Sequence, residues 1–255
     1  MTYTPFELRV LPIFIYYIFV SIFAVIVSIK MYYKWRERQV PPPLYLTLVF
    51  SFLTAALIIL SIGLAEAVIT GFYKEIYRIS LPLAYCMVVC ADIFLFIFAS
   101  YMTNKGRRAF PIIALVGIVI IIILFLPWNW WGVPQVDYEG ELSIRIYTTG
   151  GLVLFSFLIY FYIALICQKI KHNVDDKIMY TGLKLLFYSM ISLVLLFLML
   201  VMDTLMITFF NHPGYSEFTY IAWIFGLIFI ILSYLSLIMP EWLVNRIKKK
   251  YGISN

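Results

Sequence analysis

Seven stretches of nearly continuous apolar residues run along the chain, and short polar segments separate them. They cover residues 11–29, 44–70, 80–102, 109–127, 147–168, 182–210 and 217–239. A helix needs roughly 20 apolar residues to cross the hydrocarbon core of a bilayer. The runs do not alternate with a period of two, which excludes a transmembrane β-barrel. The pattern predicts an all-α integral membrane bundle of seven transmembrane helices, with one re-entrant segment as the alternative.

The polar segments between the runs set the expected domain organisation. Lys30 to Arg38 and three prolines separate the first two runs, and Gly71 to Arg78 ends the second. The longest segment outside the runs, about 128–146, is too short for a soluble domain. We therefore expect residues 1–240 to form the seven-helix bundle and residues 241–255 to form a short basic tail.

Composition narrows the class further. Hydrophobic residues make up 64% of the chain and charged residues only 13%, whereas a soluble domain has roughly half apolar and about a quarter charged residues. A soluble fold is therefore excluded, and so is disorder, which requires low hydrophobicity and high charge. With two His and three Cys, neither a multi-histidine metal site nor a disulfide framework is expected. We expect no cofactor and no nucleic-acid partner.

The distribution of basic residues predicts the orientation. Fifteen of the 19 Lys and Arg lie on one side of the expected spans, and the other side has only Arg9, Lys74, Arg78 and Arg145. Cytoplasmic loops carry the excess of basic residues in membrane proteins. The N-terminus is therefore expected outside and the C-terminus in the cytoplasm, as a multi-pass protein of the cell membrane.

Three acidic residues lie within the apolar runs, where ionisable groups are costly and are candidates for function. Glu66 is expected near the outer end of the second helix, Asp92 mid-membrane in the third, and Asp203 about two turns below the outer end of the sixth. Tyr85 shares a face with Asp92 by helical spacing. No buried Lys or Arg is expected to neutralise the acids. We expect Glu66, Tyr85, Asp92 and Asp203 to border an outward-facing polar cavity for a small or lipidic ligand.

The alternative is that each acid only hydrogen-bonds a neighbouring Ser, Thr or Tyr and fixes the packing of the helices. Cys86 and Cys90 stand four residues apart on an adjacent face of the third helix. Two sulfur ligands without a third are a weak metal signal, so we interpret both as small apolar filling. His212 lies in an outer turn, where a solvated turn is favoured over an ion site.

The segment Glu241 to Tyr251 is expected to form a short amphipathic helix. Trp242, Leu243 and Ile247 are expected on one side, with the basic residues Arg246, Lys248, Lys249 and Lys250 opposite. Such a helix would rest on the anionic inner leaflet, held by apolar area and charge. A basic anchor that only fixes the topology is the alternative.

The segment after the fourth run carries two further features. Trp128, Trp130 and Trp131 are typical of an aromatic belt at the membrane surface. The alternation of apolar and polar residues in 132–146 suggests a β-hairpin over the outer mouth of the bundle. A disordered polar connector is the alternative for that segment.

The sequence lacks the residues that several known functions of seven-helix proteins require. The seventh run has no Lys between Glu217 and Met239, which excludes covalently bound retinal. Neither His lies in a span, which argues against zinc hydrolases of the ceramidase type. Asp92 and Asp203 follow Ala and Met, not the Gly of intramembrane aspartyl proteases. Because no nucleophile and base or metal set is present, we expect no catalytic residues and no enzyme.

The seventh run ends in Met239-Pro240-Glu241-Trp242 before the basic tail. With seven spans and an outside N-terminus, this loosely resembles the seven-helix prokaryotic sensor modules that precede histidine kinases. The resemblance implies a receptor-like or sensor-like protein that acts on a cytoplasmic or membrane protein partner or on lipid. A non-catalytic subunit of a membrane complex is the alternative, and a small-solute transporter is the third possibility.

Overall fold

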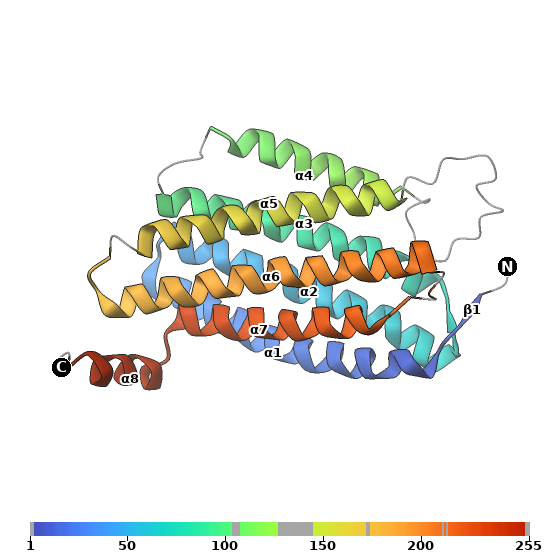
Figure 1. Ribbon diagram of the computed structural model, residues 1–255, viewed down its shortest axis with the longest axis horizontal. Coiled ribbons are helices and arrows are strands. Elements are labelled where there is room, and N and C mark those ends of the chain that lie inside the picture. Colours follow the sequence, from blue (N-terminus) through green and yellow to red (C-terminus); the bar gives the residue numbers. More distant parts are fainter. Residues whose placement is uncertain are drawn as a thin grey trace. The chain divides into compact units, whose positions relative to one another are not determined.

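The computed structural model describes residues 3–103, 108–126, 145–171, 174–210, 212 and 214–252. Within these residues the chain is almost entirely helical, with one pair of very short strands (Figure 1). The elements in chain order are β1 (Thr4–Pro5), a 3₁₀ turn (Leu8–Val10), α1 (Leu11–Arg38), α2 (Pro41–Thr70), β2 (Phe72–Tyr73), α3 (Glu75–Thr103), α4 (Phe110–Leu124), α5 (Arg145–Lys171), α6 (Lys177–Phe210), α7 (Glu217–Ile238) and α8 (Glu241–Tyr251).

Six of these helices are long and apolar enough to cross a membrane. Their membrane-compatible parts contain 22 to 31 residues, which at about 1.5 Å per residue exceed the roughly 30 Å hydrocarbon core. They are Leu8–Glu37, Pro41–Thr70, Glu75–Met102, Tyr147–Lys171, Lys177–Ile207 and Glu217–Ile238. The prediction of an all-α, multi-pass membrane protein is thereby confirmed.

The fourth apolar run gives the shorter helix α4. It spans 15 residues, and at about 1.5 Å per residue its length is roughly 22 Å, less than the hydrocarbon core. The predicted run continued to residue 127, which lies outside the described residues. A seventh crossing therefore remains a prediction.

The helices extend beyond the apolar runs that predicted them. The Lys30 to Arg38 segment, expected as a separator, is the last part of α1. The helix continues because Lys, Arg and Glu are good helix formers once they leave the apolar layer. The three prolines from Pro41 begin α2, where the missing amide hydrogens cost nothing.

The described chain consists of two compact units, and the boundary between them lies within α5, between Ser156 and Phe157. In the first unit, α1 packs against α2, α2 against α3, and α3 against α4. α2 and α3 approach each other closely at Gly63, where an added Cβ atom would lie 2.1 Å from Ser80 Oγ. Glycine at this position therefore lets the two helices meet.

The pairing of β1 with β2 was not predicted. The strands are antiparallel, with Thr4 opposite Tyr73 and Pro5 opposite Phe72. The Phe6 amide also donates to the Gly71 carbonyl at 2.9 Å. These bonds fasten the N-terminal segment to the turn between α2 and α3.

In the second unit, serine side chains join α6 to α7. Ser189 Oγ lies 2.5 Å from Ser233 Oγ, and Ser192 Oγ donates to the Phe225 carbonyl at 2.7 Å. Small hydroxyl residues at helix contacts allow close approach and hydrogen bonding inside a membrane. The α6–α7 pair is therefore held by polar contacts as well as apolar packing.

Candidate functional site

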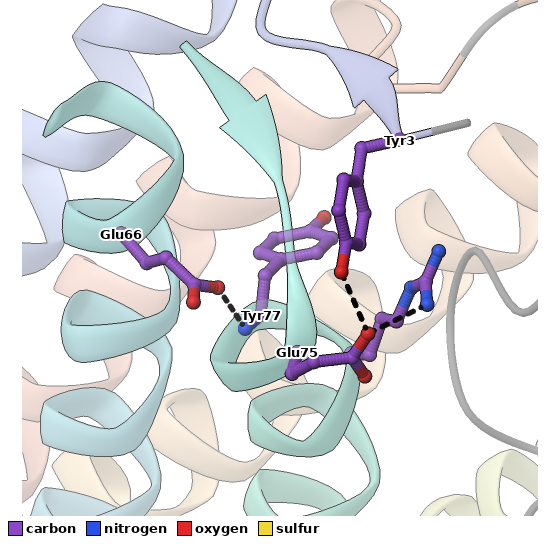
Figure 2. A network of polar contacts seen from close by, with 5 residues as sticks. Tyr3, Glu66, Glu75 and Tyr77 are labelled. Carbon is purple, nitrogen blue, oxygen red and sulfur yellow. Dashed lines mark hydrogen bonds and ion pairs between the residues drawn. The ribbon is translucent and has the colours of Figure 1, made fainter. Parts of the chain in front are cut away.

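Glu66 belongs to a group of polar side chains where α2 ends and α3 begins. The group, called the α2–α3 polar cluster below, contains Tyr3, Glu66, Glu75, Tyr77 and Arg78. Figure 2 labels Tyr3 on the N-terminal segment, Glu66 on α2, and Glu75 and Tyr77 on α3. The turn through β2 brings the two helix ends together.

The Glu66 carboxylate accepts a hydrogen bond from the backbone amide of Tyr77 at 2.9 Å (Figure 2). Tyr77 is the third residue of α3, and amides in the first turn of a helix have no partner within the helix. Negative charge is also favourable beside a helix N-terminus. Glu66 thus caps the following helix from α2.

Arg78 is buried in the first turn of α3, with 4% of its side chain exposed. Its Nη1 atom donates to Glu75 Oε1 at 3.0 Å, and the Tyr3 hydroxyl donates to the same oxygen at 3.3 Å. The guanidinium carbon lies 5.0 Å from the centre of the Tyr3 ring, within the range of a cation–π interaction. The buried Nε atom has no hydrogen-bond partner.

The position of Arg78 corrects the sequence prediction. Gly71 to Arg78 was expected as the polar segment that ends the second run, and no buried Lys or Arg was expected to neutralise the acids. Instead α3 begins at Glu75, and the N-terminal segment covers Arg78 with Tyr3. Pro82 lies one turn further along α3. Because proline has no amide hydrogen, the usual helical bond to the Arg78 carbonyl cannot form.

Aromatic residues and a second ion pair surround the cluster. The Tyr73 ring lies 5.9 Å from the Phe6 ring and 4.5 Å from the Tyr77 ring, measured between centroids. Burial raises the pKa of Tyr73 to about 12; the Glu7 carboxylate adds to this rise and Arg9 opposes it. Glu7 and Arg9 form an ion pair with each other. The Tyr73 hydroxyl is therefore protonated at neutral pH.

Asp92 lies in the middle of α3 and is almost completely buried, with 1% of its surface exposed. The Ser156 hydroxyl of α5 donates to its carboxylate at 2.6 Å. Tyr85 lies half-buried on the same helix, two turns nearer the cluster. A serine partner of this kind is what the packing alternative expected for each acid.

Asp203 lies on α6 in the second unit. Its Oδ1 atom accepts hydrogen bonds from the Ser216 amide at 2.8 Å and from the Ser216 hydroxyl at 2.5 Å. Ser216 directly precedes the first residue of α7. Asp203 thus binds the start of the next helix, as Glu66 does in the first unit.

The four predicted ligand residues therefore have different surroundings. Glu66 lies in the α2–α3 polar cluster, Tyr85 and Asp92 lie further along α3, and Asp203 has its partners in the other unit. The cluster residues Tyr3, Glu75 and Arg78 were missed. A sequence signal for Arg78 was its place directly before a strongly apolar run, three residues after Glu75.

Within the expected basic tail the chain forms the helix α8, with the bounds Glu241–Tyr251. The predicted division of its faces is wrong in one respect. Ile247 is buried with 6% exposure, whereas Trp242 is 57% exposed. Trp242 lies about 140° around the helix from Ile247 at 3.6 residues per turn, and therefore on a different face. Arg246 follows Trp242 by four residues and shares its face. Lys248 is half-buried, and Lys249 and Lys250 are exposed.

The cysteines of the described chain are free thiols. The Cys86 thiol donates weakly to the Ile121 carbonyl of α4 at 3.9 Å. Among the described residues, no three His, Cys, Asp or Glu side chains gather as metal ligands. The predictions for Trp128, Trp130, Trp131 and the hairpin in 132–146 lie outside the described residues.

The α2–α3 polar cluster thus combines a buried guanidinium, two carboxylates and an aromatic cover at one end of a helix pair. A guanidinium with an unused donor can bind a carboxylate or phosphate group, often through two hydrogen bonds. The carboxylates can accept hydrogen bonds from ammonium or hydroxyl groups. No protein-family model, no curated protein and no solved structure matches this chain.

Proposed function

We propose that the chain is a receptor-like or sensor-like protein of the cell membrane that binds a small or lipidic ligand at the α2–α3 polar cluster. The observation that carries the proposal is the buried Nε atom of Arg78, which has no partner. A buried polar group without a hydrogen bond is costly, and more so when it is charged. An anionic group of a ligand would satisfy it.

Besides its anionic group, the ligand would have a second polar group that contacts the carboxylates of the cluster. Glu75 shares its oxygen between Arg78 and Tyr3, and Glu66 is engaged by a backbone amide. A ligand with an anionic group and a nearby hydroxyl or ammonium group therefore matches the cluster best. Tyr85 and Asp92 extend the proposed site along α3, whereas a ligand role for Asp203 stays a prediction of its own.

The proposed orientation places this cluster outside the cell. The turn between α2 and α3 lies on the side with four of the 19 basic residues, the side that the positive-inside rule assigns to the exterior. In the proposal α4 is the core of a seventh crossing, so that the C-terminus lies in the cytoplasm. This is the arrangement expected of prokaryotic sensor modules.

A signal could pass from the cluster along α3. A ligand that bound Arg78 would compete with Glu75 and Tyr3, and Tyr3 belongs to the segment held by β1 and β2. Pro82 interrupts the hydrogen bonds of α3 one turn further on, and helices bend most readily at proline. Displacement of the N-terminal segment would thereby change the path of α3 toward the cytoplasmic side and its partner.

The second candidate is a non-catalytic subunit of a larger membrane complex. The outer face of α4 favours it, since Ile112 and Leu115 are 64% and 62% exposed. Lipid would cover such a face equally well, so the exposed face of α4 is also compatible with a receptor that has no partner subunit. A transporter is supported least, because transporters use discontinuous helices and the six long helices are each described as continuous.

Thermal stabilisation by candidate ligands tests the proposal. The purified chain in nanodiscs would be heated with short-chain carboxylates, phosphate monoesters and lysophospholipids, each beside a neutral counterpart. We expect anionic compounds to raise the melting temperature of the wild type but not of Arg78→Gln. Arg108→Gln, an exposed arginine outside the cluster, is the matched control and should respond like the wild type.

Two results would contradict the proposal. One is that no anionic compound in the three classes stabilises the wild-type chain. The other is equal stabilisation of the wild type and Arg78→Gln, which would place the binding site elsewhere.

A further inference from the structure

Helix α8 turns one face toward its own unit and leaves another face uncovered. Ile247 is buried, Leu243 and Val244 are half-buried, and α8 contacts α6. Trp242, Arg246 and Lys249 are exposed. These three residues lie at positions i, i+4 and i+7, which share one face of a helix. We call these three residues the open face of α8.

The connection to α7 determines how deep in the membrane the open face of α8 lies. α8 begins three residues after the last residue of α7, a helix apolar enough to cross a membrane (Figure 1). Met239, with a φ of 50°, and Pro240 turn the chain between them. The Ser236 hydroxyl donates to the Gly182 carbonyl at 2.7 Å and holds this end of α7 to α6. α8 therefore lies where the membrane meets water.

The charge around the open face is strongly positive. α8 carries four basic residues, Arg246 and Lys248 to Lys250, and one acid, Glu241. Lys177 at the start of α6 adds a further cation, with its Nζ atom 6.0 Å from the centre of the Tyr251 ring. Basic residues beside a membrane span attract anionic lipids. Tryptophan prefers the headgroup level of the bilayer.

We propose that the open face of α8 binds the phosphate groups of anionic phospholipids in the bilayer that surrounds the chain. Arg246 and Lys249 would donate to the phosphate oxygens, while the exposed indole of Trp242 inserts at the headgroup level. An anionic lipid surface fits better than an acidic protein, because the face adjoins the end of a membrane-spanning helix and includes a large aromatic residue. The site lies in the second unit and is independent of the α2–α3 polar cluster.

Native mass spectrometry of the full chain tests this proposal. The chain would be released from micelles that contain phosphatidylglycerol and phosphatidylcholine, and the retained lipids would be counted. Each basic residue near an anionic membrane contributes about a fivefold preference, so Arg246→Gln with Lys249→Gln should lower the preference for phosphatidylglycerol roughly 25-fold. Trp242→Ala should weaken the retention of both lipids. Lys34→Gln with Arg36→Gln removes the same charge from the end of α1, where Lys34 is half-buried, and should lower the preference less than the α8 variant does.

A measurement on the unaltered chain covers the case in which the α8 variant fails to fold. The preference for phosphatidylglycerol should fall as salt is added, because salt screens exposed charges. The proposal is overturned if the α8 variant keeps the wild-type preference, if the α1 control loses as much, or if salt has no effect. Retention of an acidic protein in place of lipid by the wild type would also overturn it.

Discussion

At the scale of single residues, the three acids within the apolar helices have a common role in the structure. Each carboxylate accepts a hydrogen bond from another helix or from the residue directly before one: Glu66 from the Tyr77 amide, Asp92 from Ser156 and Asp203 from Ser216. A carboxylate has about four acceptor positions. A packing role therefore does not by itself exclude that these carboxylates also bind a ligand.

The Asp92–Ser156 bond provides a direct measure of such a packing role. Removal of either partner leaves the other buried without this hydrogen bond, so we expect Asp92→Ala and Ser156→Ala each to lower the free energy of unfolding by about 1–3 kcal/mol. The double variant should lose less than the sum of the two, with a coupling of about 0.5 kcal/mol or more. Denaturant unfolding in detergent measures all four chains. Additive losses would show that the two side chains do not interact.

The acids could be found from the sequence, whereas their partners could not. A carboxylate in an apolar run can be recognised from the sequence alone. Its partner cannot, because Ser156 lies 64 residues from Asp92 and is one of many hydroxyl residues. The burial of Arg78 was missed because Tyr3, the ring that lies over its guanidinium, is 75 positions earlier in the chain. Long-range partners of this kind are a property of the tertiary fold.

At the scale of helices, the close approach of α2 and α3 depends on Gly63. An alanine there would place its Cβ atom 2.1 Å from Ser80 Oγ and 2.7 Å from Ser80 Cβ, so the helices would have to separate. Overpacking of this kind costs about 1–3 kcal/mol, and we expect Gly63→Ala to lower the free energy of unfolding by that amount. It should also weaken the Glu66–Tyr77 contact one turn away.

A second glycine provides the control for this experiment. Gly150 on α5 has no heavy atom within 4 Å of an added Cβ atom. Gly150→Ala should therefore be neutral, or should stabilise α5 by about 0.5–1 kcal/mol through its better helix propensity. If both alanine variants have the same stability in detergent, the α2–α3 contact is looser than described.

The apolar runs predicted where helices occur better than where they end. The runs mark the part of each helix that suits lipid, while the helices continue through charged residues such as those at the end of α1. The pairing of β1 with β2 had no sequence signal, because strands of two residues show no alternation. The faces of α8 were misassigned because Trp242 was grouped by hydrophobicity and not by its angle around the helix.

At the scale of the whole molecule, composition and run length were sufficient for the class. A chain with 64% hydrophobic residues must cover its surface with lipid, and six described helices have the length for it. The number of crossings depends on α4, whose described part is 15 residues long. A run near the minimum length can span, re-enter or lie at the surface, so sequence length alone cannot decide between them.

The side of the membrane on which the turn after α2 and helix α8 each lie tests the proposed topology most directly. Between the turn after α2 and helix α8 the chain crosses the membrane five times if α4 spans, and four times if it does not. Single cysteines at Lys74 and Asn245 would be labelled in intact cells with a membrane-impermeant maleimide. The wild-type chain, whose cysteines lie in apolar helices, gives the background.

We predict that Lys74→Cys is labelled in intact cells and that Asn245→Cys is labelled only after the cells are opened. This result requires an odd number of crossings between the two positions and places the α2–α3 polar cluster outside. Labelling of both positions from the same side would contradict the seven-helix topology. Labelling of Asn245→Cys alone in intact cells would reverse the orientation and place the proposed ligand site in the cytoplasm.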